Sequence, residues 1–226
     1  MTTPFCFFMP GGEAGLTVLS RVAQSTSSGN GSTSITLPAG INAGDLIIFS
    51  AMAGDSNGIP GASIAGWSSV VNFTDGSQSR ILIAAKIAVG TESSTSFNGF
   101  SGSQDQNNTR NIVVLRGNVP LTAVGTGQSI NTQWATTTIN QTISASSGTP
   151  PLLALAVYMG SAGDNLSAAR GFTIGGSPAA DDGFNTLTRH YLMWKFFPSA
   201  PANIAASLTG SVFGRGLGSA YVQLTT

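Results

Sequence analysis

The chain has 226 residues and a formal net charge of zero, and only 8% of its residues are charged, against about 25% in a typical soluble domain. No basic excess is available to bind phosphate groups, so the composition argues against a nucleic-acid-binding protein. A single cysteine, Cys6, excludes an internal disulfide framework. No apolar run approaches the ~20 residues of a spanning helix, so we expect no membrane insertion.

Residues 1–15 are expected to form an N-terminal tail. The segment MTTPFCFFMP is apolar, but it lacks a positively charged region and is stopped by Pro10, so it is a poor signal peptide. We therefore expect a protein that is made in a cytoplasm. Such an apolar tail packs either on its own domain or on a neighbouring subunit, and its candidate interface residues are Phe5, Phe7 and Phe8.

From residue 16 onward, short apolar and β-branched runs alternate with clusters of Gly, Ser, Asn and Pro. No window shows the apolar spacing of a helix. The pattern predicts an all-β sandwich with a single domain over residues 16–226. In chain order the expected strands are Leu16–Ala23, Ser32–Leu37, Asp45–Ala53, Trp67–Phe73, Arg80–Val89, Ser94–Phe100, Arg110–Arg116, Leu121–Gly125, Thr137–Ser144, Leu152–Gly160, Arg170–Ile174, Leu187–Phe197, Ile204–Thr209 and Ala220–Thr225.

An internal repeat divides the domain into halves of about 16–119 and 120–226. A shift of 109 residues superimposes like residues, including basic ones, which are rare in this chain. It places Ala53-Gly54-Asp55 on Ala162-Gly163-Asp164, Arg80 on Arg189, and Lys86 on Lys195. Each half is predicted to be a sheet-forming unit with an apolar face that it cannot bury alone. Two such units packed face to face make one sandwich with approximate two-fold symmetry.

The repeated Ala-Gly-Asp corner is better explained by the fold than by a ligand. Its glycines turn the chain, and Asp55 and Asp164 are expected to tie the turn by accepting backbone N–H bonds. One carboxylate per loop is too few for a calcium site, so we predict neither a metal nor a cofactor. Trp67 is expected to plug the core at the start of the next strand. The intervening loop is longer than a turn requires, so Ser56, Asn57 and Ile59 are further interface candidates.

Candidate catalytic residues are few. His190 is the only histidine, no G-x-S-x-G sequence accompanies it, and its repeat counterpart, Ile81, predicts an inward or interface position. Asp181-Asp182 is the only adjacent pair of carboxylates, whereas glycosidases place two carboxylates on separate elements. We therefore predict no catalytic residues and no enzymatic activity. Among the tryptophans, Trp134 lies in the polar stretch SINTQWATT and is the best candidate for contact with a glycan.

Several segments resemble a class of tailed-phage and prophage virion structural proteins. They are LPAGINAGDLIIFSAMA, a loop ending in GW, RILIAAKIAVG, STSFNGF and NIVVLRGNV, spanning roughly residues 33–119. The usual P-x-G-W of that class is Ile64-Ala65-Gly66-Trp67 here, and its F-R-G is Leu115-Arg116-Gly117. The resemblance implies a jelly-roll-like β-sandwich and a place in a phage particle, and it carries over no active-site residues.

Three hypotheses follow. The first is a structural virion protein that decorates or cements a capsid, or a related head or tail accessory protein, acting as a homo-oligomer with other virion proteins as partners. A weakly charged surface suits a packed assembly better than a soluble monomer. The second is a head- or tail-fibre module that binds a host glycan or receptor. The third, a glycan hydrolase, requires two convergent carboxylates.

Overall fold

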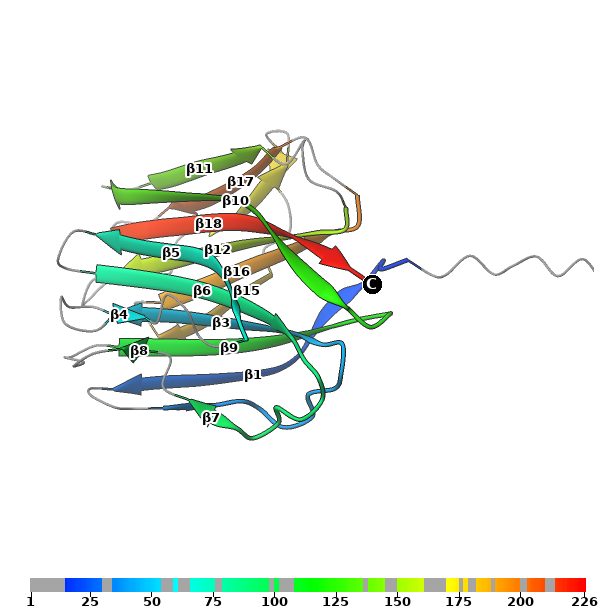
Figure 1. Ribbon diagram of the computed structural model, residues 1–226. Coiled ribbons are helices and arrows are strands. Elements are labelled where there is room, and N and C mark those ends of the chain that lie inside the picture. Colours follow the sequence, from blue (N-terminus) through cyan, green and yellow to red (C-terminus); the bar gives the residue numbers. More distant parts are fainter. Residues whose placement is uncertain are drawn as a thin grey trace, which may run out of the picture.

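The computed structural model describes residues 15–29, 34–53, 59–60, 66–75, 79–97, 100–101, 108–135, 138–144, 150–160, 170–174, 177–178, 182–187, 190–199, 203–209 and 214–226. Every regular element in these ranges is a β-strand, and the strands pair in antiparallel sheets. The prediction of an all-β fold is therefore confirmed (Figure 1). A jelly roll is a more specific arrangement of strands than an all-β fold, and it stays a prediction.

The first half is built around a five-stranded sheet with the order β1-β9-β3-β6-β5. Its strands are β1 (Leu19–Gly29), β9 (Asn108–Gly117), β3 (Leu46–Ala53), β6 (Ser79–Ile87) and β5 (Ser68–Asp75). Two short pairs accompany it, namely β2 (Ile35–Thr36) with β7 (Ser96–Phe97), and β4 (Ile59–Pro60) with β8 (Phe100–Ser101).

The second half contains a five-stranded sheet with the order β10-β18-β12-β16-β15. Its strands are β10 (Ala123–Ala135), β18 (Gly214–Thr225), β12 (Leu152–Gly160), β16 (His190–Phe197) and β15 (Asp182–Leu187). A four-stranded sheet consists of β11 (Thr138–Ser144), β17 (Asn203–Thr209), β13 (Arg170–Ile174) and β14 (Ser177–Pro178), in that order.

The two five-stranded sheets have the same arrangement of corresponding strands. In each half the first strand pairs with the last, and the last strand pairs with the central strand, β3 or β12. The shared strand order agrees with the internal repeat, but no single offset in residue number relates all the corresponding residues of the two halves. Lys86 pairs with Ile47, whereas Lys195 pairs with Ala154, which is 107 residues after Ile47. Lys86 and Lys195 correspond at an offset of 109 residues, whereas their strand partners correspond at an offset of 107. The second half therefore has two more residues than the first between the central strand and the lysine.

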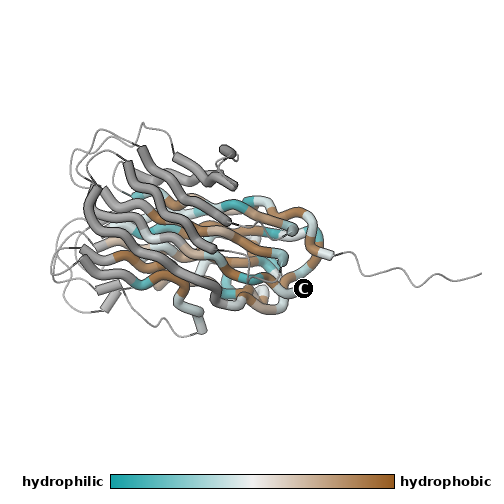
Figure 2. The backbone as a smooth tube through the Cα atoms, turned by 90° about the horizontal axis from the view of Figure 1, so that it is seen from above, coloured by the Kyte–Doolittle hydropathy of each residue, from teal (hydrophilic) through white to brown (hydrophobic). Residues whose placement is uncertain are grey.

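The main core lies between the two halves, because both five-stranded sheets contribute one face to it. Alternate residues of β3, β6 and β9 pack with alternate residues of β12, β16 and β18. These include Leu46, Ile48, Ile81, Ile83, Val113 and Leu115 from the first half, and Leu153, Leu155, Val157, Leu192 and Val222 from the second. Burial of each such side chain contributes about 1.5–3 kcal/mol. The apolar stretches follow the strands in Figure 2.

A second apolar cluster covers the other face of the first sheet. Ile47, Phe49 and Ala51 alternate with the inward residues of β3 and are fully buried here. Trp67 packs on this cluster, with its ring centroid 6.1 Å from that of Phe49 and 5.7 Å from that of Phe97. Because both of its faces are covered, β3 is an almost continuous apolar run rather than an alternating one.

Several strands differ from the expected ones. β15 was not predicted, β16 begins at His190 instead of Leu187, and β10 continues ten residues beyond Gly125. The predicted strand Ser94–Phe100 consists of the short strands β7 and β8, whereas β4 and β14 were not predicted. β18 begins at Gly214 instead of Ala220. These segments are rich in Gly, Ser, Thr and Asn, so neighbouring strands rather than side-chain periodicity make them extended.

Candidate functional site

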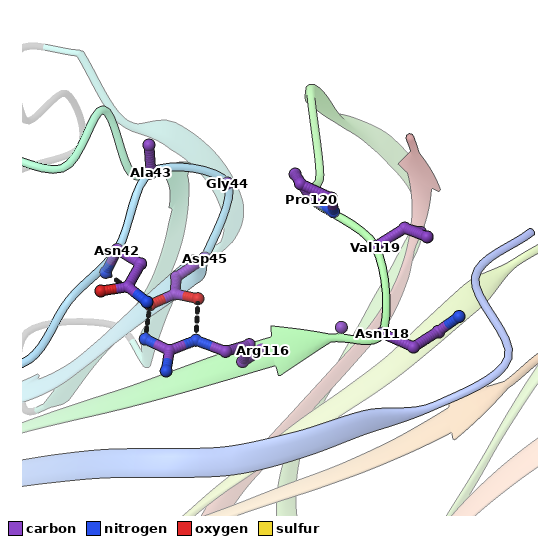
Figure 3. A pocket seen from close by; sticks show the side chains of 9 residues that line it. Asn42, Ala43, Gly44, Asp45, Arg116, Asn118, Val119 and Pro120 are labelled. Atoms are coloured by element: carbon purple, nitrogen blue, oxygen red, sulfur yellow. Dashed lines mark hydrogen bonds and ion pairs between the residues drawn. The ribbon is translucent and has the colours of Figure 1, made fainter. Parts of the chain in front are cut away.

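A pocket of about 170 Å³ lies at one end of the first sheet, where the loop before β3 meets the turn after β9 (Figure 3). The loop contributes the Ala-Gly-Asp sequence, and the turn contributes the Arg-Gly-Asn sequence. Figure 3 shows the Asp45 and Arg116 side chains facing each other on one side, with Val119 and Pro120 on the other. The lining residues are Asn42, Ala43, Gly44, Asp45, Arg116, Gly117, Asn118, Val119 and Pro120.

Asp45 and Arg116 form a two-pronged ion pair. Arg116 Nε donates to Asp45 Oδ1 at 2.8 Å, and Arg116 Nη2 donates to Asp45 Oδ2 at 2.7 Å. The carboxylate is only 2% exposed, whereas the arginine side chain is 36% exposed. Asp45 Oδ2 also accepts the Asn42 N–H at 2.8 Å. The hydrogen bond to Asp45 raises the pKa of Arg116. The pair thus joins the start of β3 to the end of β9.

Gly44 allows the two chain segments to approach closely. Its φ is +83°, and a Cβ atom at this position would lie 2.6 Å from Pro120 Cβ. Its N–H donates to the Ala88 carbonyl at 2.9 Å, and its own carbonyl accepts the Leu121 N–H at 3.0 Å. Only glycine meets both the conformational and the steric requirement. Gly44, which belongs to Ala43-Gly44-Asp45 and not to the repeated Ala53-Gly54-Asp55, therefore has a structural function where these two segments meet.

Asn118 fixes the beginning of β1 beside the pocket. Its Oδ1 accepts the Thr17 and Val18 N–H groups at 2.9 and 3.1 Å, and its Nδ2 donates to the Gly15 carbonyl at 3.1 Å. The amide therefore substitutes for a missing strand partner. Gly117 also packs tightly, because a Cβ atom there would clash with Leu16 Cδ1 and with the Val119 carbonyl oxygen.

Glu92 organises the loop after β6 in a similar way. Its carboxylate accepts the Val89, Gly90 and Thr91 N–H groups, at 2.9 Å for the closest contacts, and pairs with Lys86 Nζ at 2.9 Å. Burial alone would raise the pKa of Glu92. The backbone hydrogen bond from Val89 and the interaction with Lys86 outweigh it, so the pKa is lowered to about 2. Glu92 stays ionised as a loop-fixing acceptor.

The pocket therefore has little capacity for acid–base chemistry. Among the described residues that line it, Asp45 is the only carboxylate; this residue is 1% exposed, and its oxygens are engaged by Arg116 and by the Asn42 N–H. The geometry holds strand ends together.

His190 lies far inside the sandwich and not in the pocket. Its Nε2 is 2.7 Å from Ser50 Oγ, and its Nδ1 is 2.8 Å from Thr109 Oγ1. Burial lowers the pKa of His190 to about 3, and the side chain is fully buried. A hydroxyl beside an imidazole resembles a serine nucleophile with its base, but Thr109 stands where a carboxylate orients such a base. The ring is fully buried, so no substrate can reach the hydroxyl and the imidazole in this structure, and the two form a structural contact.

Most of the predicted site residues lie outside the described residues. These are Phe5, Phe7, Phe8, Asp55, Ser56, Asn57 and Asp164. Ile59 belongs to β4, and Trp134 belongs to β10, but their side chains are not described. Trp67 packs on the outer face of the first sheet, whereas His190 faces inward as its repeat counterpart Ile81 predicted.

Sequence reasoning missed Asp45, Arg116 and Glu92 as organising residues. The signal was the rarity of charge, since 18 of the 226 residues are acidic or basic. A carboxylate directly before a buried strand, and an arginine at the end of another, are costly positions unless the two are paired. The partnership of Ser50 with His190 had no comparable signal, because 140 residues separate them.

No protein-family model matches the chain, and no curated protein or solved structure matches it significantly. The ranges that the structure describes contain no helix long and apolar enough to span a membrane. In the same ranges, no three His, Cys, Asp or Glu side chains are grouped so that they could hold a metal ion.

Proposed function

We propose that the chain is a structural protein of a bacteriophage particle, built on a jelly-roll-like sandwich. It decorates or cements a capsid, or is a related head or tail accessory protein, and it acts as a homo-oligomer that packs against other virion proteins. The observation that carries the proposal is an edge strand, β1, that is long and almost uncharged and has exposed valines beside it and within it.

β1 has 11 residues, of which only Arg21 is charged. It lies at the edge of its sheet, and Val18 and Val22 are 55% and 42% exposed. A long edge with little charge is a template for another chain, and proteins that stay monomeric usually protect such edges with charges. The Ser25 and Ser27 hydroxyls donate to carbonyls of residues 36 and 34. Among the described residues, the first half of the strand has no such hydroxyl contact, and it contains Arg21 and a register shift at Val22. Main-chain pairing at such an edge needs few charged side chains.

The experiment combines particle composition with the mass of the purified protein. We expect the protein in purified virions and an oligomer by light scattering. Val18→Lys with Val22→Lys should shift the mass toward the monomer. Val89→Lys is the matched control, since Val89 is 68% exposed but lies after β6. A monomeric wild type that is absent from particles would refute the proposal.

A host glycan-binding module is the second candidate. Trp134 lies on β10, the edge strand of the second five-stranded sheet, where a partner or ligand can approach. A tryptophan combines a large apolar ring with an N–H donor, which suits it to interfaces. Glycan arrays with wild type and Trp134→Ala distinguish the two candidates, because only the glycan module loses binding when the indole is removed.

A further inference from the structure

Among the side chains that the structure describes, a group of polar ones interrupts the apolar core between the two halves. Ser50 on β3 and Thr109 and Asn111 on β9 alternate with the core residues Ile48 and Val113, so they face the opposite sheet. His190 on β16 alternates with Leu192 and faces them from the second half. We call these four residues, Ser50, Thr109, Asn111 and His190, the core polar cluster. All four are buried, with exposures of 4% or less.

The imidazole of His190 bridges the two halves. One ring nitrogen contacts Ser50 Oγ at 2.7 Å and the other contacts Thr109 Oγ1 at 2.8 Å. A neutral imidazole has one donor and one acceptor nitrogen, and a hydroxyl serves either, so both tautomers satisfy both contacts. One side chain of β16 therefore holds two strands of the other sheet at a defined position along the strands.

Among the described residues that face His190, none would compensate a positive charge. Ser50, Met52, Thr109 and Asn111 face it from the first half, and its strand partners are Met159 on β12 and Leu187 on β15. None of these residues is acidic. Arg110 alternates with Thr109 and Asn111 and so belongs to the other face of β9, and Arg189 lies outside the described residues. Asn111 is paired in register with Ser50, and its amide has no hydrogen-bond partner.

We propose that the core polar cluster is a proton-sensitive latch between the two halves of the chain. The neutral imidazole closes it through Ser50 and Thr109. Protonation of the imidazole is easier when the sheets separate and water reaches the ring, because the closed form buries the ring completely, so acid favours the open form. The latch is independent of the proposed virion function, because it concerns the packing of the two halves and no partner is involved.

The direction of the effect follows from the two protonation states. Burial lowers the pKa of His190 from 6.5 to about 3, so the closed form stays neutral while the open form binds a proton below pH 6.5. The contribution to stability is complete above pH 6.5 and is lost as the pH falls toward 3. By proton linkage, the opening equilibrium constant should increase roughly tenfold between pH 7.5 and 5.5.

Urea unfolding of the full chain at pH 7.5, 6.5 and 5.5 tests the latch. We expect the equilibrium constant for opening to increase roughly tenfold between pH 7.5 and 5.5 in the wild type, and no comparable increase in His190→Gln. Since His190 is the only histidine, nuclear magnetic resonance of the imidazole nitrogens gives a second readout that needs no variant. The imidazole of the folded protein should stay neutral down to pH 5. An imidazole that titrates near pH 6.5 in the folded protein, or equal pH dependence in both proteins, would overturn the proposal.

Discussion

Replacement of Arg116 by alanine tests whether the Asp45–Arg116 pair holds the first sheet together. In the wild type the Asp45 carboxylate accepts three hydrogen bonds, two from the guanidinium and one from the Asn42 N–H. Arg116→Ala leaves only the last of these. The carboxylate is 2% exposed, so water cannot easily replace the lost donors. A buried charge is then left without its partner.

The expected magnitude is about 3 kcal/mol. Loss of one partner from a buried pair costs about 3–5 kcal/mol, and the lower end applies because the Arg116 side chain is 36% exposed and partly screened by solvent. For a chain of this size, each 1 kcal/mol corresponds to about 2–4 °C, so the melting temperature should fall by about 6–12 °C. Arg116→Lys should recover less than half of the loss, because an ammonium cannot serve both oxygens as the planar guanidinium does.

A double-mutant cycle followed by urea unfolding separates the pair from other effects. Its corners are wild type, Arg116→Ala, Asp45→Asn and the double variant. We expect the double variant to be less destabilised than the sum of the single variants, with a coupling of about 1.5–3 kcal/mol. A loss below about 1 kcal/mol for Arg116→Ala, with coupling within about 0.5 kcal/mol of zero, would refute the reasoning.

Three further outcomes are expected. Gly44→Ala should cost at least 2 kcal/mol more than Gly40→Ala in urea unfolding, on the order of an overpacking penalty. Both glycines have positive φ, but only the first has Pro120 within contact distance, so equal losses would contradict the steric argument. The wild type should lose the stability contributed by the ionised Glu92 as the pH falls from about 4.5 to about 2, and Glu92→Gln should lack this contribution at every pH. Acid titrations followed by circular dichroism that are the same for both proteins would contradict this expectation. Trp67→Ala should cost about 2–3 kcal/mol, below the value for a fully buried tryptophan, and a loss under about 0.5 kcal/mol would exclude its packing function.

The strands that could be predicted are those with a strong side-chain pattern. β12 and β13 have the predicted bounds, and β3 differs by one residue, because a compact apolar run between turn residues has few alternatives. The second part of β10 and the first part of β18 were missed. These two segments pair with each other along Asn131–Ala135 and Gly214–Gly218, so each is extended because of the other. The local sequence of either segment does not indicate this pairing.

The residues of the candidate site could also be predicted only in part. Asp45 and Arg116 lie in segments that resemble virion structural proteins, but neither residue was predicted to have an organising role, because no spacing rule connects residues 71 positions apart. Their partnership depends on the register of β3 against β9, where Leu46 lies opposite Leu115. A slip of one residue would turn each side chain to the other face.

The sequence by itself determined the fold class, the absence of a disulfide framework and the existence of two similar halves. These properties depend on composition, local periodicity and self-similarity, which are all present before the chain folds. Only the tertiary structure decided that Asp45 meets Arg116 at a sheet end and that His190 contacts Ser50 and Thr109 inside the core. Such contacts arise where strands from distant parts of the chain are placed side by side or face to face. Their energies depend on burial, which a residue acquires from its neighbours in space and not from its neighbours in the chain.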